Sequence, residues 1–211
     1  MMSFFYKTVY KKFSLPAVIL CFFAAAFGQE LPDIQDLPDK IRGYKVHRAA
    51  VSVRTDQDKT LSDAAGAEAV VRVGEPGVIE VSLTGITLEI PAEIEGVGQK
   101  GRVDFLAFED FRVNGLKVEV EEYRTPFDLP KAEKIKLPKP VRINLSPVQA
   151  LRGAFNELTD SKDEWTVTGR VFVFGRFKKY GFSFKRVVPV DVRIKIENPL
   201  KKGLAQNDRS K

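Results

Sequence analysis

The sequence predicts a mainly β protein: an antiparallel β-sandwich with one accessory α-helix at about residues 146–160. Three observations lead to this prediction. Short runs rich in β-branched and aromatic residues follow one another at turn-sized intervals, which is typical of sandwich strands. Only one stretch combines helical periodicity with a capping signature. Strands and helices do not alternate along the chain, so a parallel α/β sheet is not expected.

The first strands are predicted to follow a polar segment. Residues 29–43 contain Pro32 and Pro38, and we interpret them as a linker. β-branched runs then occupy residues 44–54 and 67–73 and are separated by a polar loop.

Two positions in the next part of the chain carry turn signals. Asn114-Gly115 lies between two alternating runs, which is the strongest short sequence signal for a β-hairpin. The apolar series on the two sides of Thr84-Gly85 are out of phase. We therefore interpret Thr84-Gly85 as a bulge or a bend.

The accessory helix has a recognisable start. Ser146 is expected to be the N-cap, Pro147 suits the first helical position, and Gln149 completes a capping box. The apolar residues form one stripe, which is expected to pack on the sheet. This stripe contains Val148, Leu151, Phe155 and Leu158.

The domain is predicted to end with two long strands. Apolar and polar residues alternate from residue 188 to residue 197, which indicates a strand with one buried and one solvated face. Pro189 cannot donate a backbone hydrogen bond, so it is expected at an edge or an unpaired position. Residues 44–199 would then form an immunoglobulin- or fibronectin-III-like sandwich, followed by a flexible basic tail at 200–211.

The first 28 residues have the layout of a secretory signal peptide. Three lysines precede an uncharged run at 13–27, and cleavage is expected between Gly28 and Gln29. The protein is therefore predicted to be exported to the periplasm or the cell exterior. An uncleaved segment that anchors the protein to the membrane is the alternative.

Composition restricts the chemistry of the exported part. Cys21, the only cysteine, lies in the signal segment, so no disulfide, thiol nucleophile or cysteine metal site is expected. His47 is the only histidine, which excludes a histidine-pair metal site and favours a structural role. Removing the signal lowers the net charge from +6 by three lysines, which is too mild to indicate nucleic-acid binding. We predict no cofactor, no small-molecule substrate and no enzymatic activity.

Two other patterns were considered as sites. Gly96, Gly98 and Gly101 match a glycine-rich nucleotide loop as a string, but the residues that follow alternate like a strand. We interpret these glycines as a turn. Five acids lie near the Asn114-Gly115 turn and are expected on a solvated face, with a carboxylate enzyme site or a calcium site as the alternatives. These acids are Glu109, Asp110, Glu119, Glu121 and Glu122.

The candidate partner-binding site is a hairpin with its turn near residues 179–181. Its cations interleave with aromatic residues, a pattern that can bind a nucleic acid or an anionic lipid surface. The partners expected here are envelope proteins or an anionic lipid surface, and no nucleic acid is expected. The alternative is that the aromatic residues fill the core and the cations cover an edge. The site comprises Arg170, Phe172, Phe174, Arg176, Phe177, Lys178, Lys179, Tyr180, Lys185 and Arg186. Phe172 and Phe174 have the opposite phase to their valine neighbours, so a helix, a partner or a membrane is expected to cover them.

The order of these parts resembles a known family. "GVIEVSLTGITLEIPAEI", "FEDFRVNGLKVEVEEY", "LPKPVRINL", the capped helix, "WTVTGRV" and "FKRVVPVDVRIKIENP" are similar to late-embryogenesis-abundant (LEA) group 2 proteins, which carry the water-stress and hypersensitive-response (WHy) domain. The resemblance covers about residues 75–199. It implies a β-sandwich with one helix, no catalytic residues and no cofactor. The family's Asn-Pro-Asn stretch is absent here, where "EGVGQKGR" stands instead.

These observations predict a non-enzymatic, exported protein. The resemblance implies protection during desiccation or other water stress, or binding of envelope components. The alternative is an adaptor that offers a sheet edge or the hairpin to another envelope protein.

Overall fold

The computed structural model describes residues 33–55, 67–83, 85–95, 97–146 and 163–198. The described residues form three β-sheets with predominantly antiparallel pairing, which confirms the mainly β prediction. The predicted helix lies outside them, except for its expected N-cap, Ser146.

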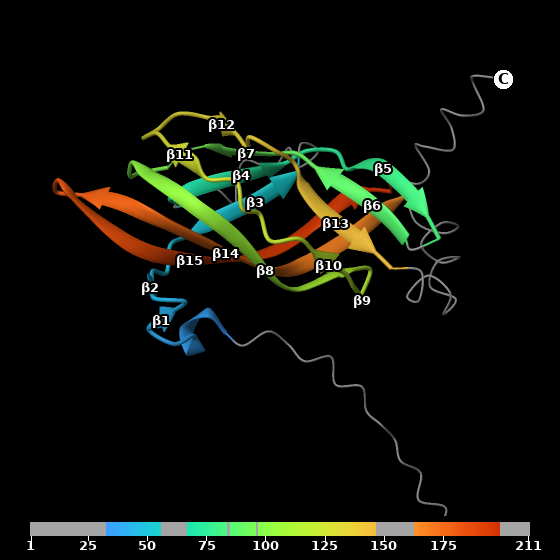
Figure 1. The fold of residues 1–211 in the computed structure, drawn as a ribbon, viewed down its shortest axis with the longest axis horizontal. Helices are drawn as coiled ribbons and strands as arrows, with labels where there is room; N and C mark the ends of the chain where they lie inside the picture. The colour runs from blue at the N-terminus through green and yellow to red at the C-terminus, as the bar shows by residue number, and fades with distance from the viewer. Residues whose placement is uncertain (1–32, 56–66, 84, 96, 147–162, 199–211) are drawn as a thin grey trace, which may run out of the picture. The chain divides into compact units, whose positions relative to one another are not determined.

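The largest sheet contains the two longest strands, which pair along their whole length and run across the ribbon in Figure 1. In sheet order its strands are β1 (Lys40–Ile41), β2 (Tyr44–Val46), β15 (Phe182–Glu197), β14 (Glu164–Lys179), β8 (Gly101–Val113) and β11 (Phe127–Leu129), with β9 (Leu116–Lys117) paired to β8.

Two smaller sheets have four strands each among the described residues. One consists of β10 (Glu119–Val120), β13 (Val141–Leu145), β6 (Gly85–Ile90) and β5 (Gly77–Ser82). The other consists of β12 (Ile135–Lys136), β7 (Ala92–Glu95), β4 (Ala69–Val73) and β3 (Val51–Thr55). A single 3-10 turn, η1 (Ile34–Asp36), precedes β1.

The tight turns follow local sequence. Asn114 (φ 49°) and Gly115 (φ 81°) form the predicted two-residue turn between β8 and β9. Where a bulge or a bend was predicted, the chain reverses completely between Ser82 and Gly85, because β5 and β6 form a hairpin in which these two residues pair. Thr84 itself lies outside the described residues. A Cβ atom at Gly85 would lie 2.2 Å from the carbonyl oxygen of Leu145, so the close approach of β13 requires glycine there.

The predicted strand at 44–54 is divided between two sheets. β2 pairs in parallel with β15, and β3 pairs in parallel with β4 in another sheet. The backbone N–H of His47 donates to the carbonyl of Val187 at 2.9 Å, and β2 ends there. Pro189 is two residues further along β15, so its nitrogen points to the same side, beyond the end of β2. This position agrees with the unpaired location predicted for Pro189.

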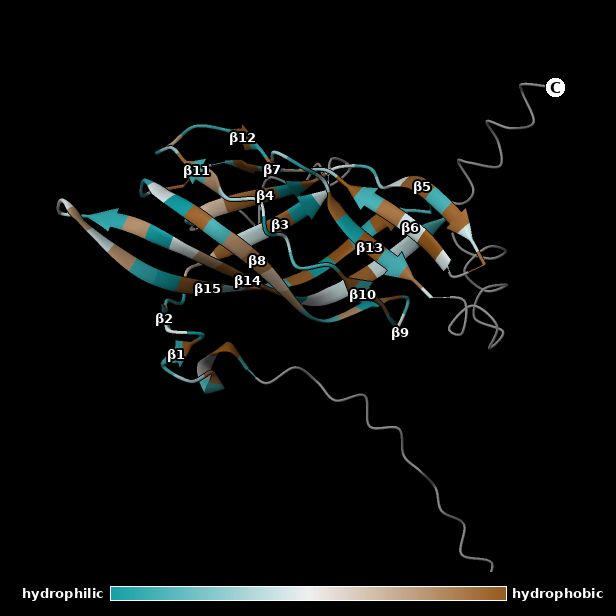
Figure 2. Ribbon diagram, in the orientation of Figure 1, coloured by the Kyte–Doolittle hydropathy of each residue, from teal (hydrophilic) through white to brown (hydrophobic). Residues whose placement is uncertain are grey.

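The largest sheet has an apolar cluster on each face. On the inner face, one cluster joins β8, β14 and β15 to β6 and β13, and a second joins β8 and β11 to β7 and β12. On the outer face, Phe172, Phe174 and Val187 pack against Val46 and the segment that precedes it. Figure 2 shows the matching alternation of hydrophobic and hydrophilic residues along the strands.

Candidate functional site

The most prominent feature of the described residues is an apolar cavity of about 670 Å³ on the inner face of the largest sheet. Val188, Val190 and Val192 of β15 line it on one side. Val51 of β3 and Val71 of β4 line it from the smaller sheet. The cavity is partly open, and its volume falls within the range of about 300–1,000 Å³ that is typical of small-molecule sites.

The cavity coincides with a gap between the core clusters. Val188 and Val190 are buried, yet neither belongs to one of the three apolar clusters formed by the described residues. The facing valines, Val51 and Val71, are also outside these clusters. Small side chains therefore face each other here without filling the space between the sheets.

The cavity has one polar end and one apolar end. His47, Glu68, Gln99 and Arg186 line it near the β14–β15 hairpin. Further along β15 the inward residues are Val188, Val190, Val192, Ile194 and Ile196, and all of them are apolar. This polarity suits an amphipathic molecule better than a uniformly apolar one.

Arg186 supplies a positive charge at the polar end, where the acidic residue Glu68 also lines the cavity. No carboxylate of the described residues forms an ion pair with Arg186, whose guanidinium lies 5.6 Å from the centre of the Phe184 ring.

Burial lowers the pKa of His47 below its ordinary value of 6.5, and the charge of Arg186 lowers it further. Glu68 acts in the opposite direction. His47 lines the cavity, and its predicted structural role stays a prediction.

The lowered pKa of His47 predicts a pH dependence of stability. Between the folded pKa and 6.5 the unfolded state binds more protons, so the free energy of unfolding falls as pH decreases through this window. We expect His47→Gln to lose less stability than the wild type between about pH 7.5 and pH 5.5. Urea unfolding followed by the fluorescence of Trp165, the only tryptophan, measures this difference. Parallel profiles would contradict it, because no other histidine titrates in the chain.

The predicted hairpin exists, and its turn consists of Tyr180 (φ 49°) and Gly181 (φ 82°). Positive φ at both residues is typical of a type I′ turn, which matches the twist of the paired strands. Three aromatic side chains near the turn are exposed: Tyr180 by 88%, Phe182 by 70% and Phe184 by 43%. Phe182 and Phe184 were not among the predicted partner-binding residues, although they continue the same aromatic pattern.

The ten predicted partner-binding residues do not form one surface. Arg170, Phe172 and Phe174 are buried, whereas Phe177 and Arg186 line the cavity. The exposed members are Arg176, Lys178, Lys179, Tyr180 and Lys185.

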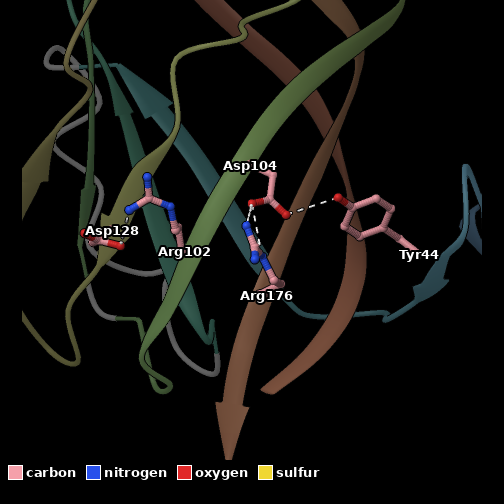
Figure 3. A network of polar contacts seen from close by, with 5 residues as sticks. All are labelled: Tyr44, Arg102, Asp104, Asp128 and Arg176. Atoms are coloured by element: carbon pink, nitrogen blue, oxygen red, sulfur yellow. Dashed lines mark hydrogen bonds and ion pairs between the residues drawn. The ribbon is translucent and has the colours of Figure 1, made fainter. Parts of the chain in front are cut away.

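Arg176 is held by an internal network at the base of the hairpin (Figure 3). Its Nη2 donates to Oδ1 of Asp104 at 2.7 Å, and the hydroxyl of Tyr44 donates to Oδ2 of the same carboxylate at 3.1 Å. The Asp104 contact raises the pKa of Arg176, while burial and then Asp104 raise the pKa of Tyr44. The network connects β14, β8 and β2, so Arg176 helps to fix the hairpin base, and its guanidinium is already paired with Asp104 although the side chain is 50% exposed.

Arg170 also forms an ion pair within the protein. It is a buried cation of β14, and its Nε donates to Oδ1 of Asp191 in β15 at 2.6 Å. The expectation that it forms part of an exposed basic surface does not agree with this burial.

The outer aromatic face is covered by the chain itself. Phe174 stacks on Phe105 at 4.4 Å between ring centres, and Tyr44 packs edge-on against Phe174 at 5.2 Å. Leu37 and Ile41 pack against the same cluster. The cover expected for Phe172 and Phe174 is therefore supplied by residues around η1, β1 and β2, part of which the sequence placed in a linker.

The other sequence patterns contribute no site. Gly101 begins strand β8 and not a helix, which agrees with the interpretation of the glycine-rich stretch as a turn. The acids near the β8–β9 turn have separate partners: Asp110 pairs with Arg112, Glu122 with Arg42 and Arg124.

Among the described residues, no group of three or more His, Cys, Asp or Glu side chains is placed to hold a metal ion. None of the helices in the described part of the chain has the length and apolar character needed to cross a membrane.

The cavity was missed by sequence reasoning, although one signal was present. The inward face of β15 and the facing strands carry mostly valine, a small side chain for the centre of a sandwich. This signal becomes visible only when the two sheets are known to face each other.

Comparison with known proteins gives weak likenesses. No protein-family model matches the chain, and no curated protein matches it. A crystal structure of a protein from Archaeoglobus fulgidus has 14% identity and a TM-score of 0.34, covering 58% of this chain and 92% of that one. The solution structure of a candidate late embryogenesis abundant (LEA) protein has 8% identity and a TM-score of 0.29, covering 65% of this chain and 76% of that one.

Proposed function

We propose that the protein binds one long acyl chain of a lipid or fatty acid in the cavity between its sheets. The observation that carries this proposal is the 670 Å³ apolar cavity, whose lining includes four valines that belong to no core cluster: Val51, Val71, Val188 and Val190. At about 30 Å³ for a group of the size of water, it accommodates roughly 20 non-hydrogen atoms. This number corresponds to a single long chain.

Energetics support a filled cavity. A closed, empty cavity of 670 Å³ would cost on the order of 16 kcal/mol at about 24 cal/mol per Å³, which exceeds the whole stability of an ordinary domain, about 5–15 kcal/mol. This cavity is partly open, so about 16 kcal/mol is an upper limit for the cost of leaving it unfilled. Water is a poor filling, because the valine walls offer it no hydrogen bonds. A flexible apolar ligand removes this cost.

The polar end of the cavity orients the ligand. An acyl chain would extend along Val190 towards Ile196, and its polar head would lie beside Arg186 and His47. The positive charge of Arg186 favours a carboxylate or phosphate there. We therefore propose an amphipathic ligand with an anionic head.

Titration of the delipidated full chain with dansyl-labelled fatty acids of increasing length tests this function. Each buried methylene contributes about 0.8 kcal/mol, so affinity is expected to rise about fourfold per carbon and then to reach a plateau when the cavity is full. A chain with about ten buried methylenes would bind in the micromolar range.

Two further readouts complete the experiment. Mass spectrometry of an organic extract of the purified protein is expected to find co-purified lipid near one molecule per chain. Dansyl-glycine, which has no chain, serves as the control probe. The proposal fails if binding does not saturate, or if affinity is independent of chain length.

A second function, protection during water stress, is favoured by the sequence resemblance over residues 75–199 and by the signal-like start of the chain. Under this proposal the protein is an exported, immunoglobulin-like LEA group 2 sandwich with a helix at 146–160. Survival of a deletion strain through drying and rehydration tests it, with a strain complemented by the full-length gene as the control. Equal survival of all strains would contradict it.

A further inference from the structure

We infer that the tip of the β14–β15 hairpin (residues 178–185) docks on an anionic phospholipid membrane. The docking does not depend on the proposed function. A second part of the inference, that a lipid passes from the membrane into the cavity along β15, rests on the proposed function.

The charge of the hairpin is one-sided. From Trp165 to Val190 the sequence contains six Arg or Lys residues and no Asp or Glu. No carboxylate of the described residues forms an ion pair with Lys178, Lys179 or Lys185. Surface lysines without an ion-pair partner are complementary to anionic headgroups. Lys185 also lies 5.7 Å from the centre of the Tyr44 ring, so Lys178 and Lys179 are the lysines most accessible at the tip.

The aromatic residues give the same tip an apolar component. Tyr180 and Phe182 are the most exposed aromatic side chains at the hairpin, and Lys179 lies 5.4 Å from the centre of the Tyr180 ring. Aromatic rings bordered by lysines are typical of segments at the membrane interface. A charge patch alone would bind acidic proteins equally well, but the protruding rings favour a lipid surface.

The turn of the hairpin, residues 179–182, lies past the end of the pairing between β14 and β8, whereas Lys178 and Ser183 border a hollow with Arg102 and Asp128. Next to the end of the β14–β8 ladder, the N–H of Lys178 donates to the carbonyl of Lys100, the residue before β8, at 2.8 Å. The type I′ turn at Tyr180 and Gly181 then closes the hairpin. Docking at residues 178–185 therefore requires no rearrangement of the sheet.

One face of β15 connects the tip to the cavity. Successive residues on this face are Phe182, exposed by 70%, and Phe184, exposed by 43%, followed by the half-buried Arg186 and the buried Val188. Arg186 and Val188 line the cavity, and Phe184 pairs with Phe177, which also lines it. A docked tip would place this face of β15, whose residues become more buried from Phe182 to Val188, between the membrane and the cavity. Arg186 would then lie beside the head of an entering lipid.

Vesicle co-sedimentation of the full chain tests the docking. We expect binding to phosphatidylglycerol-containing vesicles that is weakened by salt, and much weaker binding to pure phosphatidylcholine vesicles. Lys178→Glu/Lys179→Glu is expected to reduce binding to anionic vesicles at least tenfold, since each lysine near an anionic surface contributes about fivefold. Tyr180→Asn/Phe182→Ser is expected to reduce it as well, and asparagine tolerates the positive φ of position 180.

The control is Val81→Ser/Leu83→Ser at the β5–β6 hairpin, which exposes apolar residues without a basic cluster. This variant is expected to bind vesicles like the wild type. Trp165 fluorescence confirms that each variant is folded. Wild-type binding of both tip variants, or equal binding of the wild type to anionic and neutral vesicles, overturns the docking proposal.

Binding of dansyl-labelled fatty acid from solution separates this inference from the proposed function. The tip variants are expected to keep wild-type affinity for the monomeric probe, because residues 178, 179, 180 and 182 do not line the cavity. Vesicle binding without saturable probe binding would leave the docking intact and contradict the cavity function. Probe binding without vesicle binding would support the cavity function and contradict the docking.

Discussion

Val190→Trp is expected to abolish fatty-acid binding without destabilising the protein. Val190 lies in the middle of the inward face of β15, where the cavity separates two sheets. Facing sheets pack about 10 Å apart, so an indole ring at this position would divide the cavity. If it excludes about four methylenes at about 0.8 kcal/mol each, affinity falls by roughly 100-fold or more. Titration with the dansyl probe measures the loss.

Stability distinguishes a real cavity from a packed core. Inserting a large side chain into a packed core costs about 1–3 kcal/mol, whereas filling an apolar void costs nothing or stabilises the fold. Thermal unfolding followed by circular dichroism is therefore expected to show no loss for Val190→Trp. A loss of several kcal/mol would indicate that no space exists there.

Val187→Trp is the matched control on the opposite face of the same strand. Val187 is fully buried in the outer cluster with Phe174. We expect this variant to be destabilised by about 1–3 kcal/mol and to bind the probe normally at temperatures where it is folded.

Asp191→Ala is expected to destabilise the fold strongly, because it leaves a buried cation without its counter-charge. The Arg170 side chain is 2% exposed, while its partner Asp191 is 53% exposed. The buried Nη1 atom of Arg170 already lacks a hydrogen-bond partner in the structure. Removing one member of a buried pair costs about 3–5 kcal/mol, and solvent access at Asp191 places our expectation near the lower limit.

The Asp191→Ala effect is measured as a shift in thermal unfolding. A loss of about 3 kcal/mol corresponds to roughly 6–12 °C for a domain of this size. Arg170→Met/Asp191→Ala is expected to recover most of it, because an apolar replacement of the whole pair leaves no buried charge. A single variant within about 0.5 kcal/mol of the wild type would mean that the Arg170 guanidinium is hydrated after all.

Asp128→Ala provides the comparison. Asp128 pairs with Arg102 at 3.1 Å, with side chains exposed by 74% and 47% (Figure 3). Exposed pairs contribute about 0–1 kcal/mol, so this substitution is expected to change stability little. A large loss of stability for Asp191→Ala beside a small one for Asp128→Ala would show that burial of the Arg170 cation causes the difference.

The candidate site was only partly predictable for a geometric reason. Alternation along β14 correctly separates Phe172 and Phe174 from Val171 and Val173, but it does not show what covers either face. The structure places the chain around Tyr44 over the two phenylalanines and the cavity over the valines. Only the turn-proximal residues, such as Lys179, remained exposed as predicted.

The sequence by itself determined the features that depend on neighbours along the chain. The strand periodicity, the turns at Asn114-Gly115 and Tyr180-Gly181 and the mainly β class follow from side-chain alternation and from backbone preferences at positive φ. Only the tertiary structure decided which sheets face each other, including the parallel pairing of β2 with β15 and of β3 with β4. The cavity also depends on the tertiary structure, because its volume is the space left between Val188 and Val190 on one sheet and Val51 and Val71 on another. The distance between two facing sheets is not encoded in any local sequence pattern.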